Sequence, residues 1–462
     1  MSGPSEKAMS HKAYIHTFGC QMNEHDSARM MNILRAHGFE PAPSPEEASL
    51  ILLNTCSVRH NPENKVYSML GRLRPLKARN ADLVIGVGGC VAQQEGESIL
   101  RRERIVDMVF GPDNYFRLPE MLERVRNGER VLMTQWQPRS PDRVQNFIPD
   151  RWLEQGHVDG CKAYVAITKG CDNFCSFCIV PETRGREVSR EPENILHEVR
   201  SHVAGGVREI WLLGQNVNSY LARGRGPGGA DFGFYELLDA VSRVDGLKRL
   251  RFTSPHPNDW DHALSYLVAE RPAICNHLHL PFQAGSDRIL DLMNRRHTIR
   301  EFLDKVRYLK AVVPGIEIST DLIVGFPSET DGDFARTLEV MEEVRFGLVY
   351  SFKYSPRPGT KAARMHDDVA REVKEDRLQQ VIELQERINR EQMDQYVGTE
   401  HEVLIDGAHP RERSVMNGRT QGYRPVAVRS AMLEVGDLVQ VRIAGYSNHW
   451  LEGIPLKPVM AE

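Results

Sequence analysis

The sequence lacks any apolar run of about 18 residues, which is the length that a helix needs to cross a bilayer. Its first residues, MSGPSEKAMSHK, lack the apolar core of a secretory signal. It also lacks an excess of basic charge, because the formal net charge of the 462 residues is −4. We therefore expect a cytoplasmic protein without membrane contact, in which any contact with nucleic acid comes from a local patch.

Cysteine is scarce, with eight residues in the chain. A long chain without an export signal resides in a reducing compartment, where clustered cysteines are metal ligands or catalytic groups rather than disulfides. Six of the eight fall into two groups of three. Cys161 and Cys275 have no partner by spacing, so we expect both to be buried free thiols.

The length predicts about three domains of roughly 150 residues each. We place a first α/β domain at 12–127 and a second at 157–391. Between them, residues 128–156 lack sustained periodicity and contain several prolines, which is typical of a linker. A smaller domain rich in short alternating strands occupies 394–458.

Three short apolar segments in the first domain each end at a cysteine. The segments read AYIHTFGC, SLILLNTC and LVIGVGGC, and they end at Cys20, Cys56 and Cys90. Helix-like stretches separate them, so we expect a parallel sheet with its crevice beyond the carboxyl ends of the strands. The cysteines would then converge on that crevice and suit an iron–sulfur cluster. Two alternatives stay open, namely unrelated buried cysteines and a zinc site with a fourth ligand such as His25.

A second group, KGCDNFCSFC, spaces its cysteines as C-x3-C-x2-C at Cys171, Cys175 and Cys178. It follows the first of six candidate strands that alternate with amphipathic stretches. This order predicts a complete or partial (β/α) barrel whose chemistry lies on the loops after the strands. Three thiolates on a cubic [4Fe–4S] cluster leave one iron open to a chelating amine and carboxylate, such as those of S-adenosylmethionine. The alternative is a zinc knuckle or another structural metal site.

These motifs resemble the radical S-adenosylmethionine methylthiotransferase family. CDNFCSFC, with Phe177 before its last cysteine, is similar to the radical signature, and IVPETRGREVSR continues the family pattern. TFGCQMN, NTCSVR and VGGCVAQQEG are similar to the family's N-terminal domain, and LLGQNVNSY and LPFQAGSDRIL resemble its tRNA branch. The resemblance covers about residues 12–458. It implies two [4Fe–4S] clusters, an N-terminal parallel α/β domain, a partial radical barrel and a C-terminal RNA-binding TRAM β-barrel.

The resemblance also implies the reaction, which is methylthiolation of adenine C2 of isopentenyladenosine beside the anticodon of tRNA. One S-adenosylmethionine would supply the methyl group and a second one the radical. The implied partners are the anticodon stem-loop of tRNA, an electron donor such as flavodoxin or ferredoxin, and a sulfur donor for cluster repair. We expect a monomer. The alternatives are the same chemistry on a ribosomal-protein aspartate or on threonylcarbamoyl-adenosine in tRNA, and a non-catalytic RNA-binding iron–sulfur protein.

One stretch departs from the radical pattern. Many enzymes of this kind carry a Gly-Gly-Glu-like motif after the second strand, which holds the methionyl amine, but this chain has Gly214-Gln215-Asn216. Gln215 and Asn216 offer carbonyl oxygens in place of the carboxylate. The alternative is a polar loop without a ligand role.

Polar residues at other predicted strand ends face the site by the barrel rule, or else make structural hydrogen bonds. They are Ser254, His256, Gln283, Asp321 and Arg357. We assign cofactor contacts to Phe177, Gln215, Asn216, Ser254 and His256. The catalytic candidates are Gln283, Asp321 and Arg184, and Arg184 and Arg186 could meet a phosphate or a carboxylate.

The C-terminal part begins with an amphipathic helix expected at about 370–396, followed by the strands HEVLIDG, RPVAVRS and DLVQVRIAGYS. Five arginines fall close together here and could neutralise RNA phosphates. They are Arg411, Arg413, Arg419, Arg424 and Arg429. The alternative is a solvated face, since the C-terminal part as a whole is not basic.

Overall fold

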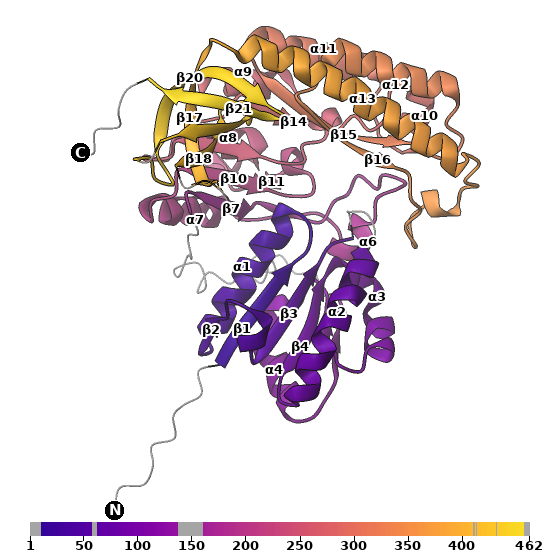
Figure 1. Ribbon diagram of the computed structural model, residues 1–462. Helices are drawn as coiled ribbons and strands as arrows, with labels where there is room; N and C mark the ends of the chain where they lie inside the picture. Colours follow the sequence, from indigo (N-terminus) through magenta and orange to yellow (C-terminus); the bar gives the residue numbers. More distant parts are fainter. Residues whose placement is uncertain are drawn as a thin grey trace, which may run out of the picture. The chain divides into compact units, whose positions relative to one another are not determined.

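The structure of the chain is a computed structural model (Figure 1). It describes residues 11–57, 62–136, 160–409, 412, 414–430 and 432–456. The chain divides into two compact units. Unit 1 holds Met1–His157 with Lys169–Cys171 and Ile179–Val188, and unit 2 holds Val158–Thr168, Asp172–Cys178 and Ser189–Glu462.

Unit 1 is built on a parallel sheet in the order β2-β1-β3-β4-β5-β6. The strands are β1 (His11–Thr17), β2 (Phe39–Pro41), β3 (Leu50–Thr55), β4 (Val84–Gly89), β5 (Met108–Phe110) and β6 (Val131–Met133). The helices are α1 (Gln21–Arg35), α2 (Pro62–Arg79), α3 (Cys90–Arg102), α4 (Leu118–Arg126) and the short α6 (Val180–Arg184).

Both faces of this sheet are covered, as the apolar run LILL of β3 requires. Leu50 and Leu52 pack in a core with α1 and α4, whereas Ile51 and Leu53 pack in a second core with α2 and α3. One predicted boundary was wrong. β6 lies inside the segment that we predicted as a linker and pairs with β5, while residues 137–156 of that segment lie outside the described residues.

Unit 2 contains six parallel strands that form an open barrel (Figure 1). The strands are β7 (Lys162–Ala166), β10 (Glu209–Leu213), β13 (Arg249–Phe252), β14 (His277–His279), β15 (Glu317–Val324) and β16 (Leu348–Lys353). They pair as β13-β10-β7 and β14-β15-β16, and a bridge between Leu250 and Ile274 links the two sheets. The predicted α/β class and the partial barrel are confirmed.

Helices cover the outer face of these strands (Figure 1). They are α7 (Pro192–Ala204), α8 (Phe234–Ser242), α9 (His262–Glu270), α10 (Asp287–Leu292), α11 (Ile299–Val312), α12 (Asp331–Val344) and α13 (Arg371–Tyr396). Among the described helices, none is both long and apolar enough to cross a membrane. Cys161 and Cys275 are buried, as predicted.

The C-terminal strands form a small closed barrel, as predicted. They are β17 (Glu400–Ala408), β18 (Val415–Thr420), β19 (Pro425–Arg429), β20 (Leu438–Ser447) and β21 (Trp450–Pro455), in the order β17-β18-β19-β21-β20. Arg249, the first residue of β13, donates a hydrogen bond to the Arg419 carbonyl of the small barrel (2.6 Å). Glu317, the first residue of β15, pairs with the Arg424 guanidinium of the same barrel (2.9 Å). The small barrel therefore docks on the amino ends of the core strands, away from their carboxyl ends.

Two candidate cysteine centres

In unit 1, Cys20, Cys56 and Cys90 lie at the carboxyl ends of three neighbouring strands. Cys20 caps α1 after β1, Cys56 directly follows β3, and Cys90 is the first residue of α3 after β4. Since β1, β3 and β4 are adjacent in the sheet, all three thiols are brought to one edge. The structure thus has the topology that the sequence predicts for this crevice.

The loops at this edge are tightly built. Gly19 has φ +112°, and a Cβ there would lie 2.3 Å from the Cβ of Cys56, so only glycine lets the two strand ends approach. Asn23 donates to the Thr55 carbonyl (2.8 Å), and Asn54 donates back to the Asn23 carbonyl (2.8 Å). These reciprocal bonds fix the Cys20 loop against the Cys56 loop.

Arg184 is buried at the same edge. It donates to Asn23 Oδ1 (3.1 Å) and to Asp26 Oδ2 (2.9 Å). Burial would raise the pKa of Asp26, but the Arg184 charge holds that pKa below its usual range. Arg184 was predicted to meet a phosphate or a carboxylate, and in unit 1 it meets a carboxylate.

The guanidinium of Arg184 also acts on the thiols. Hydrogen bonding to Cys56 and burial raise the pKa of Cys20 well above its ordinary value, and Arg184 opposes the shift. Burial likewise raises the pKa of Cys90, which hydrogen-bonds to Arg184. A buried cation beside two of the three thiols is the charge that an anionic thiolate site needs, since buried charges require partners.

The donor set of this edge fits an iron–sulfur cluster, because three thiols and no histidine ligand are characteristic of such sites. The described residues contain no group of three His, Cys, Asp or Glu side chains placed to hold a single metal ion. Donor type and strand-end topology therefore support a cluster at this edge.

The second cysteine motif is divided between the units. Cys171 belongs to unit 1, where its amide donates to the Gly185 carbonyl (3.2 Å), and Cys175 and Cys178 belong to unit 2. In unit 2 the Cys175 loop is held from α10 and the segment that follows it. Asn294 donates to the Phe174 carbonyl (2.9 Å), and Arg295 donates to Cys175 Sγ (3.4 Å).

Phe177 packs with its ring against the apolar cluster that includes Met293, Phe326 and Tyr354. This packing anchors the cysteine loop. The predicted contact between Phe177 and a cofactor stays a prediction.

Two of the predicted strand-end residues have unusual backbone conformations. Ser254 after β13 has φ +59° and Gln283 after β14 has φ +69°. A left-handed residue other than glycine costs about 1–3 kcal/mol, and such residues concentrate at functional sites. Their position at the carboxyl ends of neighbouring core strands agrees with the barrel rule.

Asn216 presents a buried oxygen after β10. Its Nδ2 donates to Asp259 Oδ2 (2.9 Å), which fixes the orientation of the amide. Its Oδ1 is buried and has no partner among the described residues. An orphan buried acceptor favours a donor from a ligand at this position. Gln215 beside it is partly exposed.

His256 offers the complementary group. Asn218 clamps its backbone by two hydrogen bonds (2.7 and 3.0 Å), and its Nδ1 accepts from the Asn258 amide (3.1 Å). Burial and the charge of Arg295 lower the pKa of His256 to about 2, so the ring is neutral and carries its proton on Nε2. That N–H has no partner among the described residues. His256 is therefore a buried hydrogen-bond donor.

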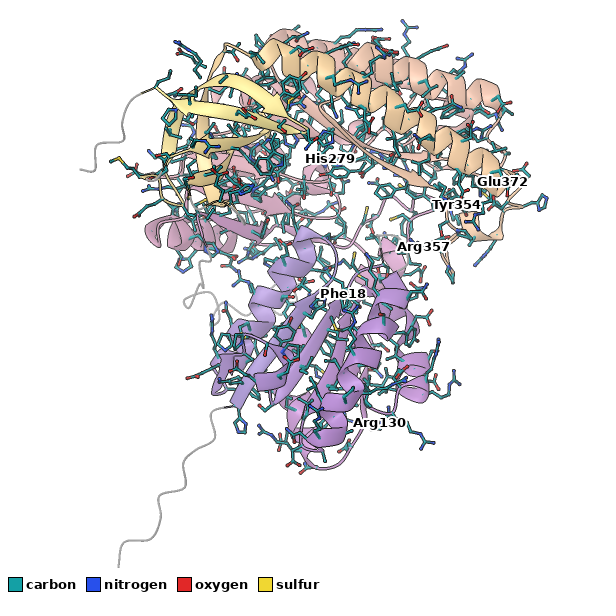
Figure 2. The ribbon with its side chains drawn as sticks, viewed as in Figure 1. Phe18, Arg130, His279, Tyr354, Arg357 and Glu372 are labelled. Carbon is teal, nitrogen blue, oxygen red and sulfur yellow. The ribbon has the colours of Figure 1, made fainter. Side chains whose placement is uncertain are left out.

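Asp321 and Gln283 lie side by side on the inner face of the barrel. The backbone N–H of Gln283 donates to the backbone carbonyl of Asp321 (3.0 Å). The side-chain Oδ2 of Asp321 lies 3.4 Å from His279 Nε2. Figure 2 shows His279 on β14, and Tyr354 and Arg357 beyond the end of β16. Gln283 thus follows the carboxyl end of β14, whereas Asp321 lies in the middle of β15 and not at its predicted end.

Sequence reasoning missed Arg295, His297 and His279. Arg295 is buried and contacts Cys175 although the two are 120 residues apart in the chain. His297 is buried against His256, with ring centroids 5.8 Å apart. No spacing pattern links these residues to the cysteine motif, so the sequence alone carried no signal for them.

The C-terminal arginines do not form one patch among the described residues. Arg424 is buried and paired with Glu317, so it is a structural residue and not the RNA contact that charge alone suggested. Arg419 lies over the Tyr423 ring at 4.4 Å, and Arg429 is exposed. Arg411 and Arg413 lie outside the described residues.

Comparison with known proteins gives two family matches and a set of close relatives. Residues 12–111 match the uncharacterized protein family UPF0004, and residues 165–341 match the radical SAM superfamily. The tRNA-2-methylthio-N(6)-dimethylallyladenosine synthase of Geobacter metallireducens is 47% identical over 95% of this chain and 97% of its own. The protein of the same name from Histophilus somni is 45% identical over 96% and 92%.

The chain belongs to this synthase family. It is an enzyme of the radical SAM superfamily, and membership brings an iron–sulfur cluster and S-adenosylmethionine as cofactors. A distant solved structure agrees on the fold. The radical S-adenosylmethionine methyltransferase TsrM from Kitasatospora setae is 16% identical, with a TM-score of 0.56 over 77% of this chain and 74% of that one.

Proposed function

We propose that this enzyme methylthiolates adenine C2 of isopentenyladenosine next to the anticodon of tRNA. The observation that carries the proposal is the identity of 44–47% over nearly the whole chain with relatives named for this product. The placement of Cys20, Cys56 and Cys90 at neighbouring strand ends supports it further.

Two clusters would divide the work. Cys171, Cys175 and Cys178 would hold a [4Fe–4S] cluster which, with S-adenosylmethionine bound, supplies a radical able to take hydrogen from an unactivated aromatic carbon. Cys20, Cys56 and Cys90 would hold the auxiliary cluster.

The protein's own residues would bind, orient and shield these groups. Asn216 Oδ1 and His256 Nε2–H are a buried acceptor and a buried donor, and they suit the amine and carboxylate of the methionyl group. Gln215, Ser254 and Phe177 complete the proposed cofactor contacts. Asp321 and Gln283 are the candidates for contacts to the reacting base.

The RNA would be bound in part by the closed C-terminal barrel, which we propose to be a TRAM domain. Arg429 is exposed there, and Arg419 stacks on Tyr423. A low-potential electron donor such as flavodoxin or ferredoxin and a sulfur donor for the auxiliary cluster complete the proposed partners. We propose a monomer that acts in the cytoplasm, with the later domain limits 157–391 and 394–458.

A test uses the full chain, reconstituted anaerobically, with a reductant, S-adenosylmethionine and a prenylated anticodon stem-loop. We expect 2-methylthio-isopentenyladenosine in the digested RNA. Cys56→Ala should abolish the product and keep 5′-deoxyadenosine release, whereas Cys175→Ala should abolish both. An enzyme that releases 5′-deoxyadenosine but never modifies the RNA would contradict the substrate.

A further inference from the structure

The inner face of β16 carries a row of exposed apolar side chains. Leu348, Tyr350 and Phe352 are 37%, 46% and 39% exposed. Residues two apart in a strand point to the same side, so the three form one stripe. The other face of β16 packs on the helices, where Val349 joins the core and Lys353 pairs with Glu375 of α13.

A polar row lies beside this stripe. In the register of the sheet, Leu348 faces Ser319 and Tyr350 faces Asp321. His279, the last residue of β14, pairs with Ser319 of β15. The His279 ring contacts the Tyr350 ring edge-on, with ring centroids 5.8 Å apart. The face therefore offers an apolar strip flanked by hydrogen-bonding groups, and large exposed aromatic groups of this kind mark binding surfaces.

The stripe is connected to the Cys175 loop by direct contacts within unit 2. Arg295 donates to Cys175 Sγ (3.4 Å) and to the Pro281 carbonyl (2.8 Å) at the end of β14. Gln283 follows, and it bridges to the strand that carries Asp321. Phe352 pairs with Ile323 of β15. Ile323 and Phe177 pack against the same apolar cluster, which includes Phe326 and Tyr354. The stripe runs along β16 from its amino end at Leu348, and its Phe352 end thus reaches the reactive end of the barrel.

We propose that the stripe of Leu348, Tyr350 and Phe352 is the subsite for the prenylated adenine, and that it sets the preference for prenylated over unprenylated RNA. This inference rests on the proposed function. An N6-alkylated adenine has an apolar chain, a flat ring face and a remaining N–H, and these match the apolar row, the Tyr350 and Phe352 rings, and the Asp321 carboxylate. Stacking of an unpaired base on aromatic side chains is the usual way in which proteins hold single-stranded RNA.

The test measures binding, which does not require turnover. The reconstituted full chain is titrated with two synthetic anticodon stem-loops that differ only in the dimethylallyl group. We expect wild type to prefer the prenylated RNA by about tenfold or more. Tyr350→Ala and Phe352→Ala should each reduce that preference by at least about fivefold, the equivalent of one weak stacking contact. Affinity for the unprenylated RNA should change less.

Two further variants keep the test decisive. Tyr350→Phe retains the ring and should keep the preference. Tyr235→Ala removes an equally exposed aromatic side chain on α8 (41%) and should leave it unchanged. Circular dichroism and iron content confirm that each variant is folded.

Equal binding of both RNAs by wild type, or a preference that survives in both alanine variants, would overturn the subsite. Such a result would mean that another part of the protein or a second copy covers the stripe. If the methylthio product still forms on prenylated RNA, the proposed function stands without the subsite. If wild type discriminates through the stripe but makes no product, the subsite stands and the function fails.

Discussion

Arg184 donates a hydrogen bond of 2.9 Å to the carboxylate of Asp26, and both side chains are buried in unit 1. The charge of Arg184 also opposes the rise that burial causes in the pKa values of Cys20 and Cys90. A residue from the segment directly after the radical motif therefore provides the positive charge at the three-cysteine edge of the N-terminal sheet.

Replacement of Arg184 should weaken the auxiliary site. Removing one partner of a buried ion pair costs about 3–5 kcal/mol, because the other charge stays buried. For Arg184→Gln we expect a lower melting temperature and a loss of up to about half of the bound iron, since the Cys175 cluster is spared. Iron per chain and circular dichroism measure both. Arg186→Gln, at an exposed position of the same segment, is the matched control. Full iron loading and unchanged melting in Arg184→Gln would refute this role.

Arg295 should tune the radical cluster. Its guanidinium lies 3.4 Å from Cys175 Sγ, and a positive donor at a ligand sulfur stabilises the reduced, more negative state. A charged hydrogen bond contributes roughly 1.5–3 kcal/mol, so Arg295→Gln should lower the potential by roughly 60–130 mV. Potentiometric titration followed by electron paramagnetic resonance measures the shift. The exposed neighbour Arg296→Gln is the control, and equal potentials in all three proteins would exclude this effect.

Arg424 and Arg429 should behave differently, although the sequence grouped them. Arg424 is buried against Glu317, so Arg424→Gln should destabilise the docked small barrel by about 3–5 kcal/mol. Arg429 is exposed, so Arg429→Gln should leave stability unchanged. If the barrel binds RNA as we propose, Arg429→Gln also reduces the slope of the logarithm of the RNA affinity against the logarithm of the salt concentration by about one. Unfolding curves and RNA titrations at several salt concentrations separate the two. The reverse result would return Arg424 to the RNA surface.

Stability should fall in mild acid because of His256 and His297. Burial and Arg295 lower their pKa values to about 2 and about 4. The unfolded histidines take up protons below about pH 6.5, and the folded ones do not. Stability is therefore retained above pH 6.5 and lost as the pH falls, by at most about 1.4 kcal/mol per unit for each ring. The contribution of His297 ends near pH 4.

Urea unfolding of the apoprotein between pH 7.5 and 5.5 measures this slope. His297→Gln should reduce the average slope over this range by about 0.7 kcal/mol per pH unit. His262→Gln, at an exposed position of α9, serves as the control. An identical slope in wild type and His297→Gln would show that the buried ring does not cause it.

Topology was predictable because parallel α/β sheets bring strand ends together. The positions of Cys20, Cys56 and Cys90, and of Gln283, follow from that rule, whereas Asp321 lies inside β15 and not at its end. The short strands β6, β18 and β21 were not predicted. β6 has only three residues, and glycines interrupt the alternating pattern of VMNGRT and WLEGIP in the other two.

The burial of single charged residues and the contacts between distant residues could not be predicted from the sequence. Charge alone placed Arg424 on an RNA surface, but Glu317, more than one hundred residues earlier, holds it inside. Arg295 reaches Cys175 only through the fold. In both cases the decisive partner lies far away in the chain, where periodicity and spacing carry no information.

The central claim is best tested by nucleoside mass spectrometry of total tRNA from cells with and without this gene. We predict that 2-methylthio-isopentenyladenosine disappears and isopentenyladenosine accumulates without the gene, and that a copy carrying Cys56→Ala or Cys175→Ala fails to restore the modification. An unchanged level of the methylthio nucleoside would contradict the assigned substrate.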